Sequence, residues 1–291
     1  MSDARAAIAP TRIGGRLFEW GSRTFVMGIV NVTPDSFSGD GLLATVAGHR
    51  GVALEIAVVQ ARRIADEGAD IIDVGGESTR PGHEPVSEEE ELARVIPAVA
   101  AIHAALPILP ISVDTAKPAV AAAAIDAGAV LLNDIWGVSP DDAMARLAAA
   151  RGVPLILMHN RAMAVYLDLV AEVLADLRAA LDRAMAAGVP RENLIVDPGF
   201  GFGKTPEHNL LVLRDLSALR ALGQPILLGT SRKSTLGFVL GGVPPEDRLE
   251  ATLATTALGI AAGADIVRVH DVRANVSAAR ISDAVIRGVP E

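Results

Sequence analysis

The chain has 291 residues, 51% of them hydrophobic, which is enough to bury a large core without disulfides, metals or a partner. It contains no cysteine, which excludes a disulfide framework, a thiolate zinc site and a cysteine nucleophile, so any metal must be bound by oxygen or imidazole. A formal net charge of −9 without a basic run argues against binding to nucleic acid or to an anionic membrane, so an anionic substrate needs a local basic pocket.

The first residues do not have the pattern of a signal peptide. Residues 1–11 lack a cationic segment followed by a long apolar run. No stretch of the chain reaches the roughly 18 uninterrupted apolar residues of a membrane span. We therefore expect a cytoplasmic protein. Residues 1–23 are predicted to form an N-terminal flap or hairpin, and residues 24–291 a single domain.

Short runs of β-branched and aliphatic residues recur along the rest of the chain. They are apolar almost throughout and show no clean alternation, which is typical of parallel strands that are buried on both faces. The predicted strands are Phe25–Val30, Ile71–Val74, Leu109–Val113, Val130–Leu132, Leu155–Met158, Leu194–Val196, Ile226–Leu228 and Ile266–Val269.

Helical patterns separate these runs. Ser87 and Glu90 form a predicted capping box, in which hydroxyl and carboxylate satisfy each other's backbone donors. Glycines that tolerate a left-handed turn follow several helices, at positions 68, 128, 188 and 263. The predicted helices are Val52–Glu67, Glu88–Ala105, Pro118–Ala127, Asp141–Ala150, Leu167–Ala187, Asn209–Leu222, Pro245–Ala262 and Val276–Ile286.

The order of these elements defines the fold class. Eight alternations of strand and helix without a Pro/Ser-rich linker favour a closed (β/α)₈ TIM barrel, an α/β fold, over an open doubly wound sheet. Such barrels commonly have about 250 residues in one domain.

Polar or ionisable residues follow nearly every predicted strand. A single residue of this kind more often caps a helix or the end of a barrel. In a barrel, however, all these positions meet on the rim where active sites lie, so together they predict one cavity. The residues are Asn31, Asp73, Asp114, Asn133, Asp134, His159, Asp197, Ser231, Arg232, Lys233, Arg268 and His270.

The residue types in this ring indicate a ligand. A carboxylate such as Asp197 accepts two parallel hydrogen bonds from a flat amidine-like edge, as in guanine or a pterin, and Asn133 and Lys233 suit mixed or acceptor edges. Arg268 and His270, with Asn31, suit a diphosphate and its Mg²⁺, which prefers few protein ligands. The ring is predicted to bind a flat heterocycle beside an anion.

Three loops add to this prediction. The segment DPGFGFGKT has three residues between its first glycine and the Gly-Lys pair, whereas a Walker A loop needs four, so we expect a turn that places Phe202 and Lys204 at the cavity mouth. Residues 31–41 and 75–82 are polar and rich in Gly, Pro and Ser, which fits connectors or lids equally well. As lids they would bring Thr79 and Arg80 to an anion and Phe37 over an aromatic substrate.

Seven segments in order resemble the dihydropteroate synthase family of pterin-binding barrels. They are MGIVNVTPDSFS, ADIIDVGGESTRPG, ISVDT, LLNDIWG, IVDPGFGFGKT, LLGTSRKS and ADIVRVHDV, spread over residues 27–272. The resemblance implies condensation of 6-hydroxymethyl-7,8-dihydropterin diphosphate with 4-aminobenzoate, which gives 7,8-dihydropteroate and diphosphate. It also implies a homodimer formed through outer helices.

The resemblance assigns roles to individual residues. The pterin would be held by Asp114, Asn133, Asp197 and Lys233, with Asp73 at the floor and Arg268 over the ring. Asn31 would bind Mg²⁺, and the diphosphate would lie against Asn31, Thr79, Arg268 and His270. The aminobenzoate side would be formed by Thr79, Arg80, Pro81, Phe202, Lys233 and Ser234, where the Ser234 hydroxyl suits a carboxylate. Asp35 and Phe37 would belong to a mobile first loop. The residues expected to act in catalysis are Asp35, Thr79, Arg80, Lys233, Arg268 and His270.

Two departures from the family pattern affect loops. Residues 160–166 are short where the family has a Gln-Gly-x-Pro pattern, and SGDG replaces SDGG in the first loop. Two alternatives are a pterin-dependent methyltransferase, which would lack GESTRPG and SRKS, and a non-catalytic pterin-binding paralogue, which would be expected to lose residues such as Asn31 or Arg80. The unaltered STRPG and DPGFGFGK segments predict ordinary sulfonamide sensitivity.

Overall fold

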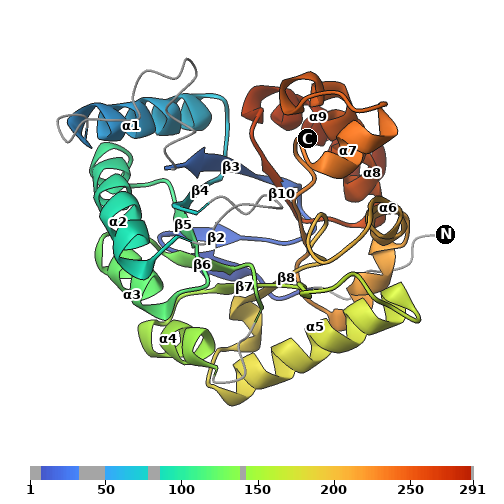
Figure 1. Ribbon diagram of the computed structural model, residues 1–291, viewed down its shortest axis with the longest axis horizontal. Coiled ribbons are helices and arrows are strands. Elements are labelled where there is room, and N and C mark those ends of the chain that lie inside the picture. Colours follow the sequence, from blue (N-terminus) through green and yellow to red (C-terminus); the bar gives the residue numbers. More distant parts are fainter. Residues whose placement is uncertain (1–7, 33–49, 78–85, 138–141, 290–291) are drawn as a thin grey trace.

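The structure is a computed structural model that describes residues 8–32, 50–77, 86–137 and 142–289, with the backbone alone for residues 50–53. In these ranges eight parallel strands wrap into a nearly closed barrel inside a layer of helices (Figure 1), which confirms the predicted TIM-barrel class. The order around the sheet is β8-β7-β6-β5-β4-β3-β10-β9. The two end strands meet at a bridge between Val196 and Ile226, where the Val196 N–H donates to the Pro225 carbonyl at 3.0 Å.

The barrel strands have nearly the bounds that the apolar runs predict. The third predicted strand begins two residues late, at Ile111, because Pro110 has no N–H to donate to a neighbouring strand. The barrel strands are β3 (Phe25–Asn31), β4 (Ile71–Gly75), β5 (Ile111–Asp114), β6 (Leu131–Asp134), β7 (Leu155–Met158), β8 (Leu194–Asp197), β9 (Leu227–Leu228) and β10 (Ile266–Val269).

The helices deviate more from the prediction. The expected helix 209–222 is two elements, because a Thr205–His208 capping box starts α6 early and the chain leaves α-helical geometry at Asp215. The α7 helix was not among the helical stretches predicted from the sequence pattern. The described α-helices are α1 (Arg50–Asp66), α2 (Glu88–Ala105), α3 (Pro118–Asp126), α4 (Ala143–Arg151), α5 (Leu169–Ala186), α6 (Pro206–Arg214), α7 (Ser234–Val239), α8 (Leu249–Ala262) and α9 (Val272–Arg287), and the 3₁₀ helices are η2 (Arg191–Asn193), η3 (Leu216–Leu222) and η4 (Pro245–Asp247). Among them, none is long and apolar enough to cross a membrane.

The helix ends can be compared with the predicted capping residues. The four glycines at 68, 128, 188 and 263 all have positive φ, as predicted. The capping box at Ser87 is only half formed: the Ser87 hydroxyl accepts from the Glu90 N–H, but the Glu90 carboxylate pairs with Arg94 one turn later. An i,i+4 ion pair has replaced the return hydrogen bond.

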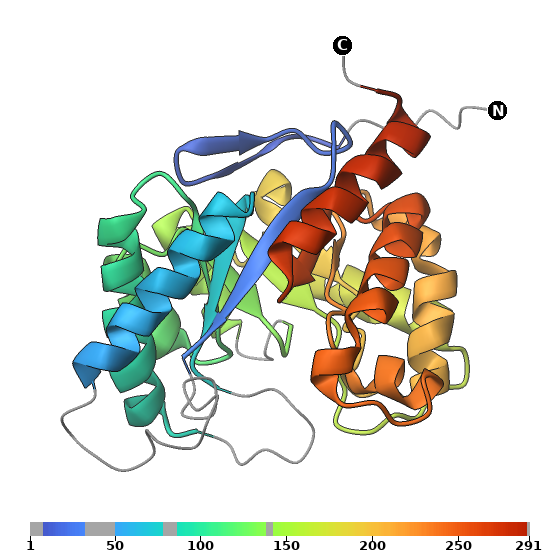
Figure 2. The same ribbon diagram turned by 90° about the horizontal axis from the view of Figure 1, so that it is seen from above.

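A hairpin closes the amino-terminal end of the barrel. Strands β1 (Thr11–Ile13) and β2 (Arg16–Phe18) pair antiparallel and lie across that end (Figure 2). Phe18 and Trp20 pack there on the inward side chains of the barrel, such as Met27 and Ile71. These inward residues form an apolar layer at the bottom of the barrel. On β4, β6, β8 and β10 the inward residue two positions further along is polar, so these polar side chains lie above an apolar floor.

Candidate active site

Four inward side chains join into one network above this floor. Arg268 on β10 donates from Nε to Asp73 Oδ2 on β4 at 2.6 Å and from Nη2 to Asp114 Oδ2 on β5 at 2.7 Å. Asn133 on β6 donates from Nδ2 to the same Asp73 oxygen at 3.1 Å. The predicted convergence of these four residues is therefore present, although they are up to 195 positions apart in the sequence.

The two carboxylates keep acceptor capacity. Asp73 Oδ1 and Asp114 Oδ1 are buried without a hydrogen-bond partner in the described parts of the chain. Buried polar atoms of this kind are costly unless a donor reaches them. A planar ligand with adjacent N–H groups would supply such donors, so the two oxygens fit the predicted heterocycle.

Burial dominates the electrostatics of the ring. It raises the pKa of Asp114 to about 7, against the opposing charge of Arg268, and it raises the pKa of Asp197 against the charge of Lys233. For Arg268 burial acts against the charge, yet Asp73 and Asp114 outweigh it and raise the guanidinium pKa. In Asp114 and Asp197 the ring thus holds two carboxylates whose charged form burial disfavours, beside a permanent cation.

Lys233 and the DPGFGFGK turn form the second wall of the site. Lys233 Nζ donates to the Phe200 carbonyl and lies 4.4 Å from the centre of the Phe202 ring. Burial lowers the pKa of Lys233 to about 8, and the charge of Asp197 opposes that shift. Asp197 Oδ1 also accepts the Gly199 N–H at 2.7 Å. The turn therefore brings an aromatic face, an amine and a carboxylate together.

Four further predicted residues lie on the same rim. Asn31 is the last residue of β3 and lies four positions after Met27, so its side chain points to the same, inner face of the barrel. This side chain makes no hydrogen bond within the described ranges. The hydroxyl of Ser231 lies 3.0 Å from His270 Nδ1 and accepts the His270 N–H at 3.1 Å. Ser234 begins α7, directly after Lys233.

Three polar residues of the predicted ring bind partners outside the Arg268 network. Asp134 follows the inward Asn133 and therefore points to the outer face of the sheet, where its Oδ1 accepts the Trp136 N–H at 3.0 Å. His159 turns toward α5, where its Nε2 lies 3.2 Å from Asp176 Oδ2. The predictions for Asp134 and His159 were wrong because successive strand residues point to opposite faces, and the last strand residue does not fix the direction of the next one. Arg232 pairs with Asp271 through two nitrogens.

Lys204 also departs from its predicted place. It does not lie at the cavity mouth but folds under the turn, with Nζ 2.9 Å from His159 Nδ1. Sequence reasoning missed Asn209 as well, which accepts the Gly201 N–H at 2.7 Å and donates to the Thr235 hydroxyl at 2.8 Å. The capping pattern at Thr205 was the available signal, because it makes Asn209 the first buried residue of α6.

The residues assigned to the first two loops lie outside the described ranges. They are Asp35, Phe37, Thr79, Arg80 and Pro81.

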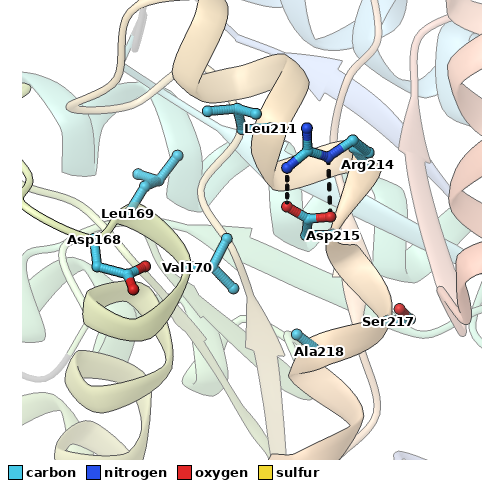
Figure 3. Close-up of a pocket in the computed structure, with 8 residues that line it drawn as sticks. All are labelled: Asp168, Leu169, Val170, Leu211, Arg214, Asp215, Ser217 and Ala218. Atoms are coloured by element: carbon cyan, nitrogen blue, oxygen red, sulfur yellow. Dashed lines mark hydrogen bonds and ion pairs between the residues drawn. The ribbon is translucent and has the colours of Figure 1, made fainter.

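A surface groove of about 560 Å³ lies on the outer wall, between the start of α5 and α6 with η3 (Figure 3). Of its three charged lining residues, Arg214 and Asp215 are paired with each other at 2.7 Å, and Asp168 caps α5 by accepting the Ala171 N–H. None of the described ring residues borders it, so it is separate from the site. Its lining residues are Asp168, Leu169, Val170, Leu211, Arg214, Asp215, Ser217 and Ala218.

The barrel and its ring define a class of protein: a (β/α)₈ enzyme whose rim carries carboxylates, an amide and cations for a flat polar substrate. The sequence profile described as "Pterin binding enzyme" matches residues 27–270. The dihydropteroate synthase of Clostridium beijerinckii is 50% identical over 277 residues, which cover 95% of this chain and 99% of that protein. The chain therefore belongs to the dihydropteroate synthase family, whose members are transferases.

Two solved structures are similar throughout. The Clostridium difficile dihydropteroate synthase, determined in the presence of pteroic acid, aligns with a TM-score of 0.87 at 47% identity and covers 93% of this chain and 99% of its own. The Xanthomonas albilineans dihydropteroate synthase with 4-aminobenzoic acid has a TM-score of 0.87 at 42% identity and covers 98% and 100%. Both chains match over nearly their whole length, so the similarity extends to the complete barrel.

Proposed function

We propose that the ring binds 6-hydroxymethyl-7,8-dihydropterin diphosphate and that this chain condenses it with 4-aminobenzoate to 7,8-dihydropteroate and diphosphate. The observation that carries the assignment of the ring is the pair of unpartnered buried oxygens on Asp73 and Asp114. Asp114, Asn133, Asp197 and Lys233 would contact the pterin edge, with Asp73 at the floor. The Arg268 guanidinium now bridges two carboxylates, and it would leave Asp114 to lie over the ring.

The second substrate would lie on the Phe202 side. Phe202 offers a ring face, and Lys233 beside it supplies a cation for the aminobenzoate carboxylate. Ser234 would add its hydroxyl, and Thr79, Arg80 and Pro81 would complete this wall from the second loop. The solved Xanthomonas albilineans relative with bound 4-aminobenzoic acid supports the substrate class.

The diphosphate would lie near Asn31, Thr79, Arg268 and His270, with Mg²⁺ on the Asn31 amide oxygen. The Asn31 side chain fits this role because it is inward, partly exposed and not engaged in a hydrogen bond in the described structure. Within the described residues no cluster of three or more acidic or imidazole groups could hold a metal, which agrees with an ion held mostly by phosphate oxygens. When bound, Mg²⁺ supplies positive charge to the leaving diphosphate.

The reaction then needs positioning and electrostatics from the protein. The bond between the exocyclic carbon and the diphosphate oxygen breaks, and Arg268 and His270 stabilise the departing charge. The electron-rich pterin stabilises the cationic carbon, and the carboxylates of Asp114 and Asp197 hold the ring. The arylamine attacks this carbon, forms the new C–N bond and loses one proton. Lys233 binds rather than reacts, so no covalent enzyme intermediate is expected.

The test uses diphosphate release from the two substrates with Mg²⁺. Asp197→Asn should reduce release by two or more orders of magnitude, because it replaces one of the two carboxylate oxygens that would accept from the pterin with an amide donor. Asp134→Asn is the matched control: it changes another buried aspartate at the end of a barrel strand, β6, but one that faces away from the ring. Equal activity of the two variants would contradict the proposed pterin site.

We also propose a homodimer formed through α7, α8 and α9, which lie together on one side of the barrel (Figure 1). Large apolar side chains on their outer surfaces are exposed, including Phe238, Leu258, Ile281 and Val285. Soluble monomers rarely expose such a group of residues. Light scattering should give twice the chain mass, and Leu258→Glu with Ile281→Glu should give a monomer.

A further inference from the structure

A buried amine fastens the DPGFGFGK turn from below. Lys204 Nζ lies 2.9 Å from His159 Nδ1, 3.1 Å from the Gly199 carbonyl and 3.1 Å from the Phe202 carbonyl. An ammonium group has three protons, so each of the three acceptors receives one. Since Nδ1 of His159 accepts, the imidazole is neutral with its proton on Nε2, and this proton points to Asp176 Oδ2 at 3.2 Å.

The fifth loop, residues 160–166, completes this cluster. Arg161 contacts Asp176 Oδ2 at 2.8 Å and Glu172 Oε2 at 2.6 Å, which ties the loop to α5. The Tyr166 hydroxyl donates to the Gly203 carbonyl at 2.7 Å, which ties the loop to the turn. The short loop is thus an anchored part of the wall behind the turn.

The turn depends on such outside support. Gly199, Gly201 and Gly203 all have φ values between +53° and +86°, a region that is accessible to glycine but not self-stabilising. A side chain at any of them would collide with a neighbour: with His159, Lys233 or Arg161. With glycine at every second position the unfolded turn has high conformational entropy, which is lost on folding. Contacts from outside the turn must offset this loss.

The same turn carries the contacts of the substrate site. Its Phe200 carbonyl accepts from Lys233 Nζ, and its Phe202 ring lies 4.4 Å from that atom. The Lys204 amine donates to the carbonyl of Gly199, directly before Phe200, and to the carbonyl of Phe202 itself. A displacement of the turn would therefore move both the aromatic face and the acceptor that place Lys233.

We propose that Lys204, oriented by His159 and Asp176, is a positioning residue that fixes the 199–204 turn and thereby the placement of Phe202 and Lys233 for the two substrates. The role in catalysis rests on the proposed function, whereas the role in placement does not. Burial, chiefly, lowers the pKa of Lys204 to about 7. A neutral amine has two protons for three acceptors, so the fastening is sensitive to the charge of this one group.

The first arm of the test observes placement directly. The chain has three lysines, at positions 117, 204 and 233, so NMR of protein with isotope-labelled lysine shows one signal for each. Lys204→Met should remove one signal and also move the Lys233 signal, because the Phe202 ring shifts nearby nuclei. Lys204→Arg should restore part of the Lys233 shift, since it keeps a cation under the turn.

The second arm measures kinetics. Lys204→Met should lower kcat/KM for aminobenzoate about 10- to 100-fold, in the range of a lost hydrogen-bonded charge, and mainly through KM. Asp176→Asn should move the Lys233 signal and lower kcat/KM in the same direction as Lys204→Met, but by a smaller amount. This second variant therefore tests the proposal even if Lys204→Met does not fold.

Arg23→Met is the control for general destabilisation. Arg23 binds both oxygens of Asp70 at the amino-terminal end of the barrel, far from the turn. It should lower stability without moving the Lys233 signal or KM. The proposal is overturned if Lys204→Met and Asp176→Asn leave the Lys233 signal in place, or if Arg23→Met moves it equally. If the unmodified protein releases no diphosphate, the proposed function fails while the placement test still gives its result.

Discussion

A substitution at Gly199 offers a sharp test of how the substrate turn is built. Gly199 has φ +67° and Gly152, at the end of α4, has φ +64°, so alanine meets the same backbone strain at both positions. Their surroundings differ. A methyl group on Gly199 would overlap the His159 carbonyl, whereas nothing lies within 4 Å of one on Gly152.

The expected costs follow from this difference. Gly152→Ala should lower the free energy of unfolding by about 1 kcal/mol, because left-handed strain of about 1–2 kcal/mol is partly offset by a less flexible unfolded chain. Gly199→Ala adds the cost of forcing apart packed groups, about 1–3 kcal/mol. The His159 backbone cannot yield easily, since its N–H is bonded to the Asp197 carbonyl at 2.9 Å. We therefore expect about 2–4 kcal/mol for Gly199→Ala.

Urea unfolding of both variants measures the two costs under the same conditions. Binding of a pterin is a second readout, because the Gly199 N–H donates to Asp197 Oδ1, so Gly199→Ala should weaken binding and Gly152→Ala should not. Unfolding costs that agree within about 0.5 kcal/mol would refute the argument, since the strain alone would then explain both.

Three further predictions concern protonation. NMR titration of the lysines should give a pKa near 7 for Lys204 and near 8 for Lys233. The pKa of Lys117 should lie above its usual value, because burial lowers it but hydrogen bonds to two glutamates outweigh that effect. A common pKa near that of free lysine would contradict the burial argument. His159 should titrate near 4, chiefly because burial and then Lys204 disfavour its charge. Between about pH 4 and 6.5 the unfolded state therefore binds more protons than the folded state, so ~3 kcal/mol of stability should be lost as the pH falls through this window. His159→Gln should remove this pH dependence of stability. The same pH profile in the variant would contradict the prediction. Asp114 should lose its charge below about pH 7, so calorimetry should show pterin affinity falling as the pH drops through 7, and Asp114→Asn should abolish this dependence.

The sequence alone determined the layers of the barrel and most of the ring. Strands that are buried on both faces need continuous apolar residues, so their runs are visible without a structure. A polar residue within or directly after such a run interrupts this pattern, which is why the positions of Asp73, Asp114, Asn133, Asp197 and Arg268 could be predicted. Segment resemblance then identified the family, which the comparisons confirm.

Only the tertiary structure decided which polar residues meet. Arg268 binds Asp73 from 195 positions away and Asp114 from 154, and these partners follow from the register and closure of the barrel. His159 was expected in the ring and Lys204 at the cavity mouth, yet they pair with each other behind the wall. The physical reason is that composition and periodicity set which residues are buried, whereas the direction of each side chain and its hydrogen-bond partner depend on backbone geometry that distant segments impose.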